Sequence, residues 1–100
     1  MPDAARILII EDEPEIRRFV CAAIVEEGWR FAEAASAAQG FEQAAALQPA
    51  AILLDLGLPD RDGVKFISDV RSWSSVPIVV MSARSAEAEK IAALDAGADD

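Results

Sequence analysis

Two runs of consecutive apolar residues dominate the hydrophobic pattern of this chain. They are Ile-Leu-Ile-Ile at residues 7–10 and Ala-Ile-Leu-Leu at residues 51–54. Runs of this kind are typical of strands that are buried on both faces, as in a parallel sheet. With two further apolar segments, the pattern predicts four strands, over residues 6–10, 29–34, 50–54 and 77–81.

Between the predicted strands, apolar residues recur at the three- and four-residue spacing of amphipathic helices. The first helix is expected to begin at Pro14 and to end at Gly28 in a left-handed cap. Its apolar stripe consists of Ile16, Phe19, Val20, Ala23 and Ile24. Three more helices are predicted, over residues 37–47, 64–73 and 85–96.

Local signals refine these helices. Ser36 is a predicted N-cap, and Asp60 and Asp62 are expected to serve as turn and N-cap residues before the third helix. The residues expected on the buried or apolar sides of the last three helices are Phe41, Ala44 and Ala45, then Phe66, Ile67 and Val70, then Ala88, Ile91, Ala92 and Leu94. Gly97 is expected to end the fourth helix.

Strands and helices therefore alternate as βαβαβαβα along 100 residues. Such alternation predicts an α/β domain with a doubly wound parallel sheet that helices cover on both faces. The length suits one small domain.

Acidic residues stand where two of the strands stop. Glu11 and Asp12 follow the first apolar run, and Asp55 follows the run at residues 51–54. Ligands of open parallel sheets bind beyond the carboxyl ends of the strands, so we expect these three carboxylates to share one crevice. Grouped carboxylates repel each other unless a proton or a cation intervenes, and Mg²⁺ suits a few carboxylates plus water and a phosphate.

The same rim carries further candidate groups. A carboxylate such as Asp55 can attack phosphorus and form an aspartyl phosphate. Ser82 and Ala83 follow the fourth strand, where a hydroxyl and a backbone N–H can bind phosphoryl oxygens. Gly57 allows close approach of the backbone, so its carbonyl is a candidate metal ligand.

Composition narrows the range of partners. With 18 acidic and 9 basic residues the net charge is −9, which argues against contact with nucleic acid or with anionic membranes by this segment. No apolar stretch approaches the ~20 residues of a membrane-spanning helix. Cys21 is the only cysteine, so no internal disulfide is possible and a reducing cytoplasm is the simplest compartment. We expect the Cys21 side chain to pack against other apolar residues and to have no chemical role.

Four segments together resemble the receiver domain of bacterial two-component response regulators, and within that family the OmpR/PhoB class that includes potassium-transport regulators. They are Ile7–Glu13, Leu53–Gly63, Pro77–Arg84 and Ala96–Asp100. The resemblance implies a flavodoxin-like sheet in the order 2-1-3-4-(5). It also implies that Asp55 accepts a phosphoryl group from a histidine kinase, with Mg²⁺ held by Glu11, Asp12, Asp55 and the Gly57 carbonyl.

Further roles follow from the same resemblance. Ser82 would be the switch hydroxyl, and Ala83 would offer its N–H to the phosphoryl group. The charged face on which this class forms homodimers would contain Lys90, Asp95, Asp99 and Asp100. The family's fifth strand, fifth helix and winged-helix DNA-binding domain have no counterpart in these residues, so the receiver is expected to be incomplete at its C-terminal end. The fourth strand would then be an exposed apolar edge through which copies could associate.

Two other functions compete with this interpretation. A Mg²⁺-dependent phosphohydrolase would use an aspartate nucleophile such as Asp55, but such enzymes usually carry a second acid two residues later, where this chain has Gly57. A nucleotide-binding half-domain would need a glycine-rich phosphate loop where this chain has the acidic residues 11–13. A phosphoacceptor switch, with at most weak hydrolysis of its own aspartyl phosphate, fits better than either.

Overall fold

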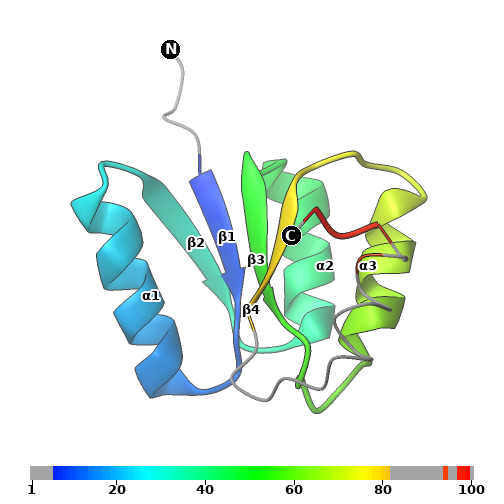
Figure 1. Cartoon of the computed structure of the whole chain (residues 1–100), viewed down its shortest axis with the longest axis horizontal. Helices are drawn as coiled ribbons and strands as arrows, with labels where there is room; N and C mark the ends of the chain where they lie inside the picture. Colours follow the sequence, from blue (N-terminus) through cyan, green and yellow to red (C-terminus); the bar gives the residue numbers. More distant parts are fainter. Residues whose placement is uncertain (1–5, 82–93, 95–96, 100) are drawn as a thin grey trace.

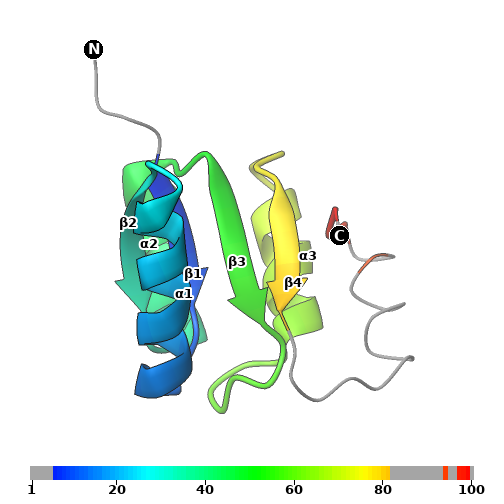
Figure 2. The same cartoon turned by 60° about the vertical axis from the view of Figure 1, so that its left-hand side comes forward.

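The computed structural model describes residues 6–81, 94 and 97–99. Its helices and strands are β1 (Arg6–Ile10), α1 (Pro14–Glu26), β2 (Arg30–Ala34), α2 (Ala37–Leu47), β3 (Ala51–Asp55), α3 (Gly63–Arg71) and β4 (Ile78–Met81). All the strand arrows in Figure 2 point the same way, and the strands pair in parallel in the order β2-β1-β3-β4. The predicted doubly wound sheet is confirmed. The predicted helix at 85–96 lies outside the described residues, except for Leu94, which is helical and half exposed.

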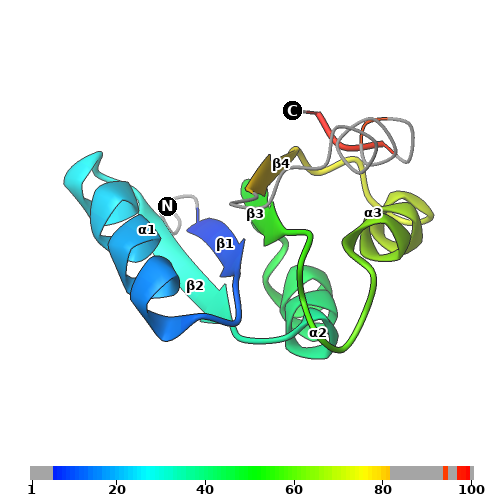
Figure 3. The ribbon, with the colours of Figure 1, turned by 60° about the horizontal axis from the view of Figure 1, so that its bottom comes forward.

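Helices cover both faces of the sheet. Figure 1 shows the order of the elements, and Figure 3 shows α1 on one face with α2 and α3 on the other. Side chains of a strand point alternately to its two faces. In β1, Ile7 and Ile9 therefore pack towards α1, whereas Leu8 and Ile10 belong to the core beneath α2 and α3. All four are buried, as the continuous apolar run predicts.

The larger core lies between the sheet and the α2–α3 layer. Phe66, Ile67 and Val70 of α3 are fully buried there, which confirms their predicted orientation. In α2 the prediction was right for Ala44 but wrong for Ala45, which is exposed. The buried side of α2 is formed by Ala37, Gly40 and Ala44, and the predicted Phe41 is partly buried against the same core.

The smaller core lies under α1, where Cys21 is buried and Val20 and Ile24 are partly buried against it. Phe19, predicted to lie on the apolar stripe, is 75% exposed. The stripe faces β1 and β2 through Val20, Cys21 and Ile24, so Phe19 lies at its flank, where no other described element covers it. At 13 residues α1 is the longest helix that the structure describes, and none there has the length and apolarity needed to cross a membrane.

The helix ends follow the predicted signals, with one difference. Gly28 follows α1 with φ +88°, a left-handed conformation that glycine adopts without strain. Ser36 accepts a hydrogen bond from the Gln39 N–H, and Asp62 accepts one from the Val64 N–H at the start of α3. Asp60 was expected to act before α3, but its carboxylate binds the first turn of α2 instead.

The outer edge of β4 is partly covered by residues 97–99. The Ile78 N–H donates to the Asp99 carboxylate (2.8 Å), and the Asp99 N–H donates to the Ile78 carbonyl (2.8 Å). Arg71 of α3 fixes this segment by donating to the Gly97 carbonyl and to the Asp99 carboxylate. At Ile78, therefore, the predicted open edge is already occupied, whereas Val79 next to it is 36% exposed.

Candidate metal centre

Three carboxylates meet at the carboxyl ends of β1 and β3. The register pairs Ile10 with Leu54, so Glu11 and Asp55 are the next residues along two adjacent strands. One carboxylate oxygen each from Glu11, Asp12 and Asp55 lies within 4.8 Å of the other two. The predicted convergence of these side chains is confirmed.

Glu11 is held at both its backbone and its side chain. It is 4% exposed, and it is the one charged residue that is buried in the described part of the chain. Its N–H donates to the Ala34 carbonyl of β2 (3.1 Å), and its Oε2 accepts from the Glu13 N–H (3.1 Å). Burial, reinforced by repulsion from Asp55, raises the pKa of Glu11 from 4.5 to about 7, although the bond from Glu13 favours the charged form.

Asp12 and Asp55 are more accessible, since each is half-buried. Asp55 is the last residue of β3, and its Oδ1 accepts a hydrogen bond from the Gly57 N–H (3.0 Å). The end of β3 thus fixes the position of the Asp55 backbone. The hydrogen bond from the turn after it fixes the orientation of the Asp55 carboxylate.

The donor set fits a hard divalent cation. Three carboxylates supply only oxygen ligands, and their mutual repulsion, which adds to the effect of burial in raising the pKa of Glu11, is relieved when a cation binds. Glu11, Asp12 and Asp55 are therefore the residues that can hold Mg²⁺. Ser82 and Ala83, the predicted phosphoryl-binding groups, lie outside the described residues.

The loop between β3 and α3 is anchored by buried residues and by a long-range cap. Leu56 and Leu58 are buried in the larger core. The two carboxylate oxygens of Asp60 accept from the Ala37 and Ala38 N–H groups of α2 (2.9 and 3.0 Å), and these bonds lower the pKa of Asp60. The loop that follows Asp55 is thereby tied to a neighbouring helix.

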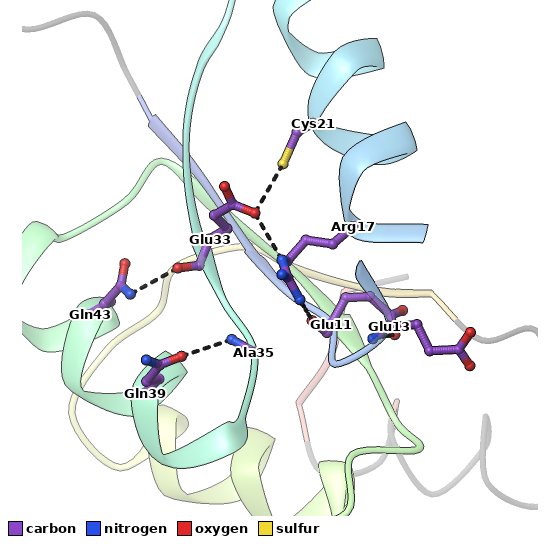
Figure 4. A network of polar contacts seen from close by, with 8 residues as sticks. All are labelled: Glu11, Glu13, Arg17, Cys21, Glu33, Ala35, Gln39 and Gln43. Atoms are coloured by element: carbon purple, nitrogen blue, oxygen red, sulfur yellow. Dashed lines mark hydrogen bonds and ion pairs between the residues drawn. The ribbon is translucent and has the colours of Figure 1, made fainter. Parts of the chain in front are cut away.

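Arg17 and Glu33 are the residues near the site that the sequence analysis missed. Figure 4 shows the Arg17 guanidinium between Glu33 and the loop of residues 11–13, called here the metal-ligand loop. Its Nη1 donates to the Glu11 carbonyl (2.9 Å) and its Nε donates to Glu33 Oε1 (2.8 Å). The usable signal was an arginine placed one helical turn after the acidic residues 11–13, where it can reach back to them.

Comparison with known proteins agrees with this geometry. The response regulator receiver domain family matches residues 7–100. The KDP operon transcriptional regulatory protein KdpE of Escherichia coli is 56% identical over 94 residues, which are 94% of this chain and 42% of that protein. KdpE of Mycobacterium tuberculosis is 39% identical over the same shares of the two chains. The chain thus spans less than half the length of these curated relatives.

Solved structures give the same result. The BeF3-activated receiver domain of Klebsiella pneumoniae RstA superposes with a TM-score of 0.90 at 27% identity, over 95% of this chain and 81% of that one. A putative response regulator from Chloroflexus aurantiacus gives 0.91 at 27% identity, over 98% and 83%. The fold, the clustered carboxylates and the matching relatives agree, and the chain belongs to the family of response regulator receiver domains of two-component systems.

Proposed function

We propose that Asp55 accepts a phosphoryl group from a histidine kinase, and that Mg²⁺ is held for this step by Glu11, Asp12, Asp55 and the Gly57 carbonyl. The observation that carries the proposal is the approach of three carboxylates to within 4.8 Å of one another at two adjacent strand ends. Receiver domains generally bind Mg²⁺, and this donor set suits it.

The orientation of Asp55 suits it to act as the nucleophile. Its Oδ1 is engaged by the Gly57 N–H, so Oδ2 is the oxygen assigned to attack phosphorus. The new O–P bond forms as the P–N bond of the phosphohistidine breaks, and the electron pair of that bond stays on the imidazole nitrogen. When bound, Mg²⁺ neutralises charge on the phosphoryl oxygens.

We assign the response to phosphorylation to groups at the same edge of the sheet and to a domain outside these 100 residues. Ser82 and the Ala83 N–H are assigned to the phosphoryl oxygens. The KdpE relatives are transcriptional regulators, so we assign this receiver to the control of a DNA-binding domain outside the 100 residues, in the cytoplasm. Two copies would pair through the face that contains Lys90, Asp95, Asp99 and Asp100, or through the part of the β4 edge beyond Ile78.

A small phosphodonor tests the acceptor. The protein is incubated with acetyl phosphate and Mg²⁺, and hydroxylamine-labile phosphate is measured by mass spectrometry of the intact chain and its peptides. Wild type should carry one acyl phosphate at Asp55, and EDTA should abolish it. Asp55→Asn should carry none, whereas Glu42→Gln, an exposed acid on α2, should behave as wild type. Equal labelling of Asp55→Asn and wild type would refute the assignment.

Sustained phosphohydrolase activity is not expected. Gly57 occupies the place of the second acid that such enzymes use, so an activated water has no general acid or base there. We expect only slow loss of the chain's own aspartyl phosphate. Rapid multiple turnover of acetyl phosphate would favour the hydrolase instead.

A further inference from the structure

Arg17 connects three elements of the fold at one point beside the metal centre. Its backbone lies in α1, its Nη1 donates to the Glu11 carbonyl directly after β1, and its Nε donates to Glu33 of β2. Glu33 is fixed in turn, because its backbone carbonyl accepts from Gln43 Nε2 of α2 (2.9 Å). Figure 4 shows this chain of contacts running from α2 through β2 to the metal-ligand loop.

The contact reaches the backbone of Glu11 and none of the ligand oxygens. With the bond from the Glu11 N–H to the Ala34 carbonyl and the bond from Glu13 to its carboxylate, Arg17 completes a set that fixes the N–H, the carbonyl and the side chain of one residue. The carboxylate that must face a cation is therefore pre-oriented by neighbours that do not compete for the cation.

Charge neutralisation does not explain the arrangement. The Arg17 guanidinium is paired at 2.8 Å with Glu33, whose carboxylate offsets its positive charge. An ion pair whose glutamate side chain is 47% exposed also adds little to stability. What the guanidinium does supply is a planar fork that holds two acceptors from different elements in a fixed relation.

We propose that Arg17, held by Glu33, is a positioning residue that sets the geometry of Glu11 for Mg²⁺. The inference rests on the proposed function, because it takes Glu11 to be a metal ligand. Mg²⁺ demands near-ideal octahedral geometry, whereas Ca²⁺ tolerates irregular ligand positions. Loss of the positioning contact should therefore weaken Mg²⁺ binding much more than Ca²⁺ binding.

The test is calorimetric titration of the folded protein with Mg²⁺ alone and with Ca²⁺ alone. Arg17→Ala should raise the Kd for Mg²⁺ about 10-fold, the size typical of residues that orient metal ligands, and change the Kd for Ca²⁺ much less. The matched control is Arg18→Ala, which removes the same charge from an exposed neighbouring position and should leave both values unchanged.

Glu33 variants provide an independent arm, which also serves if Arg17→Ala does not fold. Glu33→Gln keeps an oxygen that accepts from Nε and should retain wild-type Mg²⁺ affinity, whereas Glu33→Ala should shift it in the direction of Arg17→Ala. In metal-free protein, the Glu13 amide proton should exchange with solvent faster in Arg17→Ala than in Arg18→Ala, because its acceptor, Glu11, is less fixed.

The possible failures can be told apart. If wild type and Arg18→Ala bind no Mg²⁺, the proposed metal site is wrong and the role of Arg17 falls with it. If wild type binds Mg²⁺ and Arg17→Ala binds it equally well, or loses Mg²⁺ and Ca²⁺ affinity in the same proportion, then the metal site stands and the positioning role is refuted.

Discussion

Replacing Asp55 by asparagine should stabilise the metal-free protein. Asparagine keeps the shape of the side chain and an oxygen that can accept from the Gly57 N–H, so the main change is the loss of one negative charge. Two unit charges at 4.8 Å, the upper limit for these oxygens, repel by about 1 kcal/mol in water and about 3.5 kcal/mol at an effective dielectric constant of 20. We expect Asp55→Asn to raise the free energy of unfolding by about 1–3 kcal/mol at pH 8.

Urea unfolding in EDTA, followed by circular dichroism at pH 8 and pH 5, measures this gain. At pH 5 Glu11 is protonated in the folded state, because its pKa is about 7, so its repulsion with Asp55 is absent and the gain should shrink. Glu42→Gln removes the same charge from an exposed position on α2, and it reports how much comes from lowering the net charge of −9.

Mg²⁺ should narrow this difference in stability or reverse it. A ligand at 100 times its Kd stabilises the folded state by about 2.7 kcal/mol, and wild type should gain this while Asp55→Asn gains less. The reasoning would be refuted if Asp55→Asn and Glu42→Gln gave equal gains in EDTA. It would be refuted equally if the gain of Asp55→Asn were the same at pH 5 as at pH 8.

Four further outcomes follow from the contacts around the site. Because a cation must displace a proton from Glu11, whose pKa is about 7, the calorimetric Kd for Mg²⁺ should rise about tenfold per unit below pH 7, and a flat profile would exclude Glu11 as a ligand. In metal-free protein, the folded state favours protonated Glu11, because its pKa is raised there. This contribution to the free energy of unfolding is fully present below pH 4.5 and is lost as the pH rises through about 7. Gly63→Ala would place a Cβ 2.8 Å from the Leu56 Cα, so it should cost about 1–3 kcal/mol in urea unfolding, and an unchanged midpoint would contradict that close approach. Asp60→Ala should cost about 1 kcal/mol at pH 7 by uncapping α2. Since the pKa of Asp60 is lowered from 3.8, that difference should vanish as the pH falls below this value, and a difference that persisted would point to packing instead.

Much of the fold could be predicted because each buried strand of the sheet centre is a continuous run of apolar residues, which is visible in the local sequence. The run at residues 7–10 is apolar at every position, and the structure buries both of its faces. The site followed from the same pattern, since Glu11 and Asp55 stand at strand ends that a parallel sheet must bring to one edge. Periodicity could not show that Phe19 is exposed, because it identifies the apolar side of a helix but not the neighbour that covers it.

Contacts between segments that are distant in the sequence could not be predicted either. Asp60 caps a helix that begins 23 residues earlier, and Arg17 meets Glu33 16 residues away. Each pairing depends on how loops and helices pack over the sheet, which no local propensity encodes. Asp60 was predicted to act before α3, but it caps α2, because the helix that it reaches is set by tertiary structure.

Diffraction at the manganese absorption edge, from crystals of the protein grown with Mn²⁺ in place of Mg²⁺, can locate the cation itself. One anomalous peak is expected among the carboxylates of Glu11, Asp12 and Asp55, with ligand distances of about 2.2 Å, close to those of the magnesium ion that it replaces. An anomalous peak elsewhere on the molecule, with none among these three side chains at saturating Mn²⁺, would contradict the assignment of this metal centre.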